Sequence, residues 1–149
     1  MSAAVKPRGC TNLKLRQLSR AVSRRYDACL SESGLQNTQY ALLSQVVLLG
    51  PVRPTDLARA MKLDSSTLTR NLQSLIAAGW AELGPGEDAR SRLVIATDLG
   101  RHKRSEAQRA WKQAQLALNQ QLGVERVLAL HTLLDECMSL LDEAPADEA

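Results

Sequence analysis

Small hydroxyl and basic side chains gather between residues 64 and 73, at the start of a predicted helix. Hydroxyl groups at a helix start let the backbone approach a partner closely and can bond phosphates or base edges, and a helix N-terminus attracts phosphate. An arginine one turn later, Arg70, could bond guanine through two hydrogen bonds, a contact worth about 1–3 kcal/mol of discrimination. The candidate residues of this segment are Ser65, Ser66, Thr67, Thr69, Arg70 and Gln73.

A second set of charged residues follows in a turn rich in Gly and Pro. Asp88, Arg90 and Arg92 lie between two strand-like runs, Trp80 to Leu83 and Leu93 to Ala96. A flexible cation on such a two-stranded projection suits the narrow minor groove of DNA, where negative potential is concentrated. The helix and the hairpin together therefore predict a surface that occupies adjacent grooves of one duplex.

Each of these residues also has a simpler interpretation. Asp64 or Ser65 is a suitable N-cap, so the serines could serve only as caps, and Arg70 could be solvated. Asp88 could form an ordinary ion pair with a hairpin arginine. Other basic residues before and between the helices would add affinity and salt dependence but little specificity if they touch phosphates. These are Arg53, Arg59 and Lys62.

The elements that must position these side chains follow from three-four spacing of apolar residues and from Gly and Pro at the breaks. Gly79 would stop the helix that carries Arg70, with Leu68, Leu72 and Leu75 facing the core. The expected fold is mainly α (α+β), with about six helices and a two- to three-stranded β wing. The expected helices cover residues 11–31, 37–49, 54–61, 65–78, 98–122 and 124–141.

Composition narrows the class of protein. The chain has 149 residues, of which 44% are hydrophobic and 3% aromatic, with no Phe, and this favours one domain of packed helices. Of its 19 Lys and Arg, 16 lie between Lys6 and Arg104, whereas 8 of the 16 Asp and Glu lie after Arg104, which fits a polyanionic partner for the basic body.

Several kinds of site and location are not expected. Three separated cysteines and two histidines make a disulfide framework or a metal site unexpected, and no cofactor motif is present. The chain has neither an apolar run long enough to span a membrane nor a secretory signal, so we expect no membrane partner and a cytoplasmic location.

The combined spacing of the central motifs resembles the MarR (multiple antibiotic resistance regulator) family of winged helix-turn-helix transcription factors. The similarity extends from about Cys10 to Leu141 because the flanking helices also match in number and length. The motifs are Leu57-Ala58, Ser66-x-Leu68-Thr69-Arg70-Asn71-Leu72-x-x-Leu75-x-x-x-Gly79-Trp80, Asp88-x-Arg90-Ser91 and Ala96-Thr97-x-x-Gly100.

The resemblance implies a homodimeric regulator, most often a repressor, that binds a pseudo-palindromic double-stranded DNA operator. It implies one MarR-type domain over residues 1–149, with dimerisation helices at 11–34 and 123–141. A DNA-binding lobe at 37–100 and a connecting helix at 98–122 would complete it, and we expect residues 142–149 to be disordered. By resemblance, Arg90 is the wing arginine and Asp88 holds it in orientation.

The resemblance also implies release from DNA by a small ligand or by thiol oxidation. Arg16, Tyr26, Tyr40 and Trp111 could line a cleft for an aromatic carboxylate, although core packing explains the aromatic residues at least as well. Cys10 is the first redox candidate and Cys29 the second. Cys29 falls on the apolar stripe of the first helix, where a thiol is usually a small hydrophobic side chain.

Two other classes of function remain as alternatives. A thiol enzyme would use Cys10 or Cys29 with His102 or His131, but no cysteine has a histidine at a motif spacing. A winged-helix adaptor for protein contacts often lacks basic wing residues, so Arg90 together with Arg70 argues against it. We therefore expect a regulator and no enzymatic activity.

Overall fold

The computed structural model describes residues 4–88 and 90–142. It is mainly helical with one hairpin, which confirms the expected fold class. Both strands include residues that the sequence places in the turn, and Ser31 belongs to a short 3-10 helix. The elements are α1 (Thr11–Leu30), η1 (Ser31–Ser33), α2 (Asn37–Leu49), α3 (Pro54–Met61), α4 (Ser65–Ala77), β1 (Ala81–Pro85), β2 (Arg92–Ala96), α5 (Asp98–Leu122) and α6 (Val124–Asp142).

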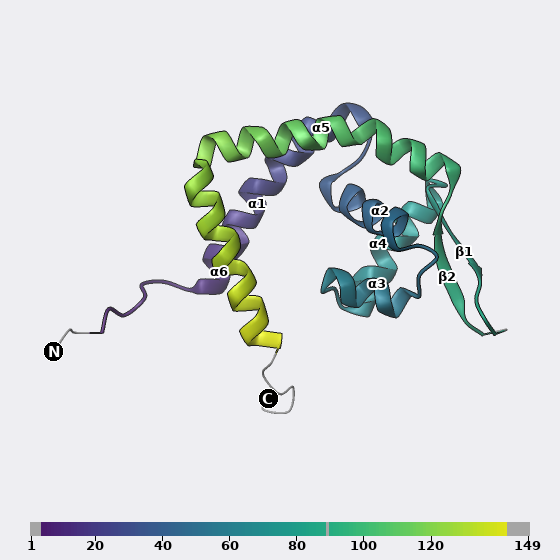
Figure 1. Cartoon of the computed structure of the whole chain (residues 1–149), viewed down its shortest axis with the longest axis horizontal. Helices are drawn as coiled ribbons and strands as arrows, with labels where there is room; N and C mark the ends of the chain where they lie inside the picture. Colours follow the sequence, from purple (N-terminus) through teal and green to yellow (C-terminus); the bar gives the residue numbers. More distant parts are fainter. Residues whose placement is uncertain (1–3, 89, 143–149) are drawn as a thin grey trace.

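The long helix α5 joins two parts of the molecule (Figure 1). At one end it leaves the hairpin of a lobe built from α2, α3 and α4, and at the other end it turns at Gly123 into α6. Helix α1 packs along α5, and α6 lines a common cleft with α1 and α5. The chain therefore separates a winged lobe from an arm that contains both terminal helices.

The core of the winged lobe lies between α2, α3, α4 and the hairpin. Leu43, Leu57, Leu75 and Val94 contribute fully buried side chains to it. The strands pair antiparallel with Ala81 opposite Ala96, and Val52 exchanges backbone hydrogen bonds with Val94 through an isolated β-bridge beside this two-stranded sheet. Each such buried side chain contributes about 1.5–3 kcal/mol, which makes the lobe a stable support for its surface.

A second apolar cluster joins the lobe to the arm. Leu30, Tyr40 and Ala107 are buried where α1, α2 and α5 meet, and Trp80 packs against both clusters. Asp27 at the end of α1 accepts hydrogen bonds from the backbone N–H and the side-chain amide of Asn37, at 2.7 and 2.9 Å. This contact fixes the start of α2 relative to α1.

The arm exposes apolar residues that sequence periodicity assigns to a buried face. On α1, Leu15 and Leu18 are exposed, and so is Cys29, which corrects its expected role as a buried small hydrophobic residue. Cys29 is exposed because Leu30 takes the inward position in the last turn of α1. On α6, Val127 is the one buried residue. A single chain does not cover this stripe.

Two further expectations concern the ends and the membrane. Asp142, which the sequence assigns to the tail, is the last residue of α6, and residues 143–149 lie outside the described part of the chain. No helix in residues 4–88 and 90–142 is long and apolar enough to cross a membrane.

Candidate nucleic-acid interface

Helix α4 begins at a carboxylate that accepts three hydrogen bonds. Asp64 is the N-cap, and it accepts from the Thr67 backbone N–H at 2.7 Å, the Ser66 hydroxyl at 2.8 Å and the Thr67 hydroxyl at 3.0 Å. These bonds, that from the Thr67 backbone foremost, lower the pKa of Asp64 to about 2. Asp64 is therefore ionised at neutral pH, and Ser65 is not the cap.

The two faces of α4 divide as the sequence predicts. Leu68, Leu72 and Leu75 are buried in the lobe, and the Gln39 amide on α2 donates to the Ser74 hydroxyl at 2.8 Å. The opposite face is free to meet a partner, and Thr67 at its edge is half-buried. The exposed residues there are Ser65, Ser66, Thr69, Arg70 and Gln73.

Asp88 organises the tip of the hairpin through the backbone. Its Oδ1 accepts from the backbone N–H of Arg90 at 2.9 Å, from the N–H of Ser91 at 2.8 Å and from the Ser91 hydroxyl at 3.0 Å. These bonds lower the pKa of Asp88, and the nearby Arg53 guanidinium adds a smaller effect in the same direction.

The orientation of Arg90 therefore has a different cause from the side-chain ion pair that the sequence suggests. Within the described residues, no ion pair joins Asp88 to Arg90 or Arg92. Asp88 instead sets the backbone from which the exposed Arg90 side chain projects. Because the guanidinium is not engaged by Asp88, it stays available to an external anion.

Other basic residues surround this surface. Arg53 is the N-cap residue of α3 and lines a polar notch between α3 and the hairpin, and Arg92 begins β2; both are exposed. Arg59 pairs with Asp56 on α3, and Lys62 pairs with Asp142 at the end of α6. Four basic residues of this surface form no ion pair within the described residues, namely Arg53, Arg70, Arg90 and Arg92.

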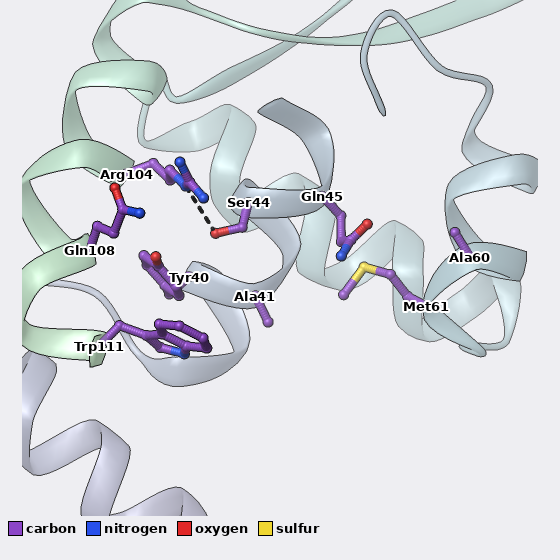
Figure 2. A pocket seen from close by; sticks show the side chains of 9 residues that line it. All are labelled: Tyr40, Ala41, Ser44, Gln45, Ala60, Met61, Arg104, Gln108 and Trp111. Atoms are coloured by element: carbon purple, nitrogen blue, oxygen red, sulfur yellow. Dashed lines mark hydrogen bonds between the residues drawn. The ribbon is translucent and has the colours of Figure 1, made fainter. Parts of the chain in front are cut away.

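A separate cavity of about 360 Å³ lies between α2, α3 and α5 (Figure 2). Tyr40 and Trp111 form one wall, with ring centroids 5.6 Å apart and nearly parallel planes. In the view of Figure 2 Arg104 is drawn above Tyr40, and its Nε donates to the Ser44 hydroxyl at 3.4 Å. The cavity therefore combines two aromatic faces with one cation.

This cavity contains two of the four residues that the sequence suggests for an effector cleft. Tyr26 contacts Trp111 at a centroid distance of 6.3 Å but lines a different cleft, and Arg16 is exposed on α1. Arg104, which is not among the residues that the sequence suggests for this cleft, is half-buried and supplies the cation instead. Arg104, Gln108 and Trp111 are separated by four and three residues, and this helical spacing was the sequence signal that the three share one face of α5.

The cysteines are free and exposed. Cys10 precedes the first residue of α1, at the opposite end of that 20-residue helix from the Tyr40 cluster, so about 30 Å of helix separates the two within one chain. Cys29 lies near Arg109 at the outer face of α5. No group of three His, Cys, Asp or Glu residues that could hold a metal ion occurs in the residues described.

Comparison with known proteins identifies the kind of molecule that carries this surface. A model described as "MarR family" matches residues 33–91, from the end of η1 to the residue before β2. The uncharacterized HTH-type transcriptional regulator YwoH of Bacillus subtilis is 26% identical over 93 residues, 62% of this chain and 68% of that protein. Residues 33–91 of the chain thus match the MarR family.

Solved structures agree with this assignment over nearly the whole described chain. The M. tuberculosis transcriptional regulator MosR, in complex with DNA, is 28% identical with a TM-score of 0.71, covering 87% of this chain and 98% of that one. Bordetella bronchiseptica BpsR shares the fold at 18% identity and a TM-score of 0.78, covering 92% and 99%. The chain is therefore similar to DNA-binding transcriptional regulators of the MarR family.

The Asp64 cap gives the stability of this protein a defined dependence on pH. Because the folded-state pKa is lowered to about 2 from an ordinary value of 3.8, the cap stabilises the fold above about pH 4 and this contribution is lost as the pH falls to about 2. Asp64→Asn retains a capping side chain but cannot titrate. We expect the difference in unfolding free energy between wild type and variant to shrink over that interval, as measured by urea unfolding. A difference that stays constant from pH 5 to pH 2, a range around these pKa values, would contradict the assignment.

Proposed function

We propose that this protein is a repressor that binds a pseudo-palindromic operator as a homodimer, with α4 in the major groove and the hairpin tip in the minor groove. The observation that carries the proposal is the placement of the exposed polar face of α4 and the Asp88-organised tip on one rigid lobe. Small hydroxyls and a flexible arginine suit the major groove, and a projecting arginine suits the minor groove.

The uncovered arm supports the homodimer. Exposed large apolar side chains follow α1 and α6, and half of the residues that line a cleft of about 280 Å³ between α1, α5 and α6 are aliphatic. Contiguous exposed apolar surface of this kind marks a protein–protein interface. The residues exposed on the two helices are Leu13, Leu15, Leu18, Val124, Leu128, Leu133, Leu134, Met138, Leu140 and Leu141.

Two measurements on the intact chain test the proposal. Selection from a randomised duplex library should enrich a sequence with two inverted half-sites, whose centres are about 10 base pairs or a multiple of it apart. Native mass spectrometry should then show two chains on one selected duplex. Enrichment of no sequence would contradict sequence-specific binding, and a complex of one chain with one duplex would contradict the dimer.

The cavity between α2 and α5 supports control by a small aromatic anion. Its volume of about 360 Å³ falls in the range of small-molecule sites, and the Arg104 guanidinium lies beside the stacked rings of Tyr40 and Trp111. A carboxylate would bond the guanidinium while its ring packs on the aromatic wall. The solved structure of BpsR, which shares this fold, concerns regulation of DNA binding by 6-hydroxynicotinic acid, an aromatic carboxylate.

Replacing Arg104 tests this site. Arg104→Met retains the length of the side chain and removes its charge, so we expect hydroxybenzoate to bind about tenfold more weakly. Isothermal titration calorimetry measures this affinity directly. Arg101→Met, which removes a charge from an exposed position in the first turn of α5, is the matched control. Equal affinity of both variants and the wild type would exclude Arg104 as the carboxylate ligand.

Release by oxidation at Cys10 or Cys29 stays a prediction from the sequence. Both thiols are exposed, as an oxidant would require, but neither lies among the residues of the aromatic cavity.

A further inference from the structure

We infer that the hydroxyl groups of Ser66 and Thr69 act as hydrogen-bond acceptors toward DNA, and so read the amino groups of adenine or cytosine instead of binding phosphates. The inference rests on the proposed function, because it assigns a readout chemistry to the face of α4 placed in the major groove. Both residues are exposed on that face.

The position of each hydroxyl proton follows from its neighbour. The Ser66 Oγ lies 2.8 Å from Asp64 Oδ1, and an ionised carboxylate has acceptors but no proton, so the proton in this bond belongs to Ser66. The Thr69 Oγ1 lies 2.8 Å from the backbone carbonyl oxygen of Ser65, which also can only accept. Each hydroxyl has one proton and has already donated it within the helix.

Each hydroxyl oxygen keeps its lone pairs, so it can only accept a further hydrogen bond. Phosphate oxygens, guanine O6 and N7, and thymine O4 are all acceptors, so none of them can bond an oxygen whose proton is engaged. The donors in the major groove are the N6 amino group of adenine and the N4 amino group of cytosine. A base contact by Ser66 or Thr69 is therefore restricted to these two groups.

Arg70, on the same face of α4, donates hydrogen bonds, whereas the two hydroxyls accept them. A guanidinium has five donors and no acceptor, which matches guanine O6 and N7. Ser66 and Arg70 are four residues apart and so lie one above the other on an α-helix. We expect a half-site in which guanine faces Arg70 while an amino-bearing base on a neighbouring pair faces Ser66.

The Asp64 side chain makes donation from the Ser66 hydroxyl to a phosphate unfavourable. To donate to a phosphate, Ser66 would have to break its bond to an ionised carboxylate and bring the phosphate towards that negative charge. The carboxylate itself is held by the Thr67 backbone N–H at 2.7 Å and cannot turn away without uncapping α4.

The test uses the full chain and a duplex selected from the randomised library. Amino groups are removed one base at a time, by replacing adenine with purine and cytosine with pyrimidin-2-one, and affinity is measured for the wild type and for Ser66→Ala. We expect one position where the wild type loses about 3- to 10-fold in affinity, the value of one neutral hydrogen bond. Ser66→Ala should lose the same factor on the natural duplex and nothing more on the modified one. Thr69→Val should behave likewise at another position.

Methylphosphonate substitution provides the contrary readout. If the Ser66 hydroxyl donates to a phosphate, the losses of binding free energy from Ser66→Ala and from neutralising that phosphate will not add up. The loss from Ser66→Ala will then add to that from removing any amino group. This result would overturn the inference. Unchanged affinity of both Ser66→Ala and Thr69→Val would also overturn it. If the wild type enriches no duplex at all, the proposed function fails as well, so the two failures are distinguishable.

A variant that frees the hydroxyl completes the design. In Asp64→Ser the serine oxygen can cap the Thr67 N–H, but no carboxylate is left to take the Ser66 proton. We expect this variant, with its fold checked by circular dichroism, to acquire coupling between Ser66 and a phosphate that the wild type lacks. Retention of the wild-type pattern would overturn the role assigned to Asp64.

Discussion

Arg90→Ala is expected to weaken binding of a selected duplex by about 10- to 100-fold per protomer, within the range of about 1–3 kcal/mol that an arginine contact with DNA contributes. The hairpin tip is exposed and its conformation is held by Asp88 bonds to the backbone, which the substitution retains. The unfolding free energy should therefore change by no more than about 0.5 kcal/mol. Fluorescence anisotropy of a labelled duplex, with urea unfolding in parallel, measures both quantities.

Two matched variants show whether the effect belongs to the minor-groove contact. Arg109→Ala removes the same charge from an exposed site on α5, outside the winged lobe, and should change affinity little. Arg90→Lys retains the charge without the planar guanidinium and should fall between alanine and wild type. Equal losses for Arg90→Ala and Arg109→Ala would indicate a non-specific charge effect and contradict the assigned role.

Gly100→Ala is expected to lower the unfolding free energy by about 3 kcal/mol or more. Gly100 lies in the first turn of α5, where a Cβ would be 2.8 Å from the carbonyl carbon of Trp80 and closer still to its oxygen. The same oxygen accepts a hydrogen bond from the Thr97 backbone N–H at 3.1 Å. Backbone atoms cannot relax as a flexible side chain does, so α5 would have to move away from the hairpin.

Gly123→Ala separates this clash from ordinary glycine effects. Gly123 has a positive φ of 89°, but a Cβ on it would meet no described atom within 4 Å. Its substitution therefore tests backbone strain alone, at about 1–3 kcal/mol. Chemical denaturation of both variants gives the comparison. A smaller loss at Gly100 than at Gly123 would mean that the close approach of α5 to Trp80 does not constrain the fold.

Local patterns in the sequence were enough to predict the limits of most elements and the polar face of α4. These features depend on interactions within a few residues: the Asp64 cap, the apolar spacing through Leu68 and Leu75, and the stop at Gly79. The same local patterns indicated that Arg70 and the hairpin arginines belong to one DNA-binding surface.

Contacts between distant residues depend on how the helices cross, which local patterns do not specify. The approach of α2 to α5 brings Arg104 to Tyr40, and no periodicity within either helix specifies that crossing. The exposure of the α1 stripe also required the folded structure, since periodicity identifies an apolar face but not what covers it. Likewise, residue types at the α4 start do not state where a hydroxyl proton goes, because that depends on the atom placed opposite it.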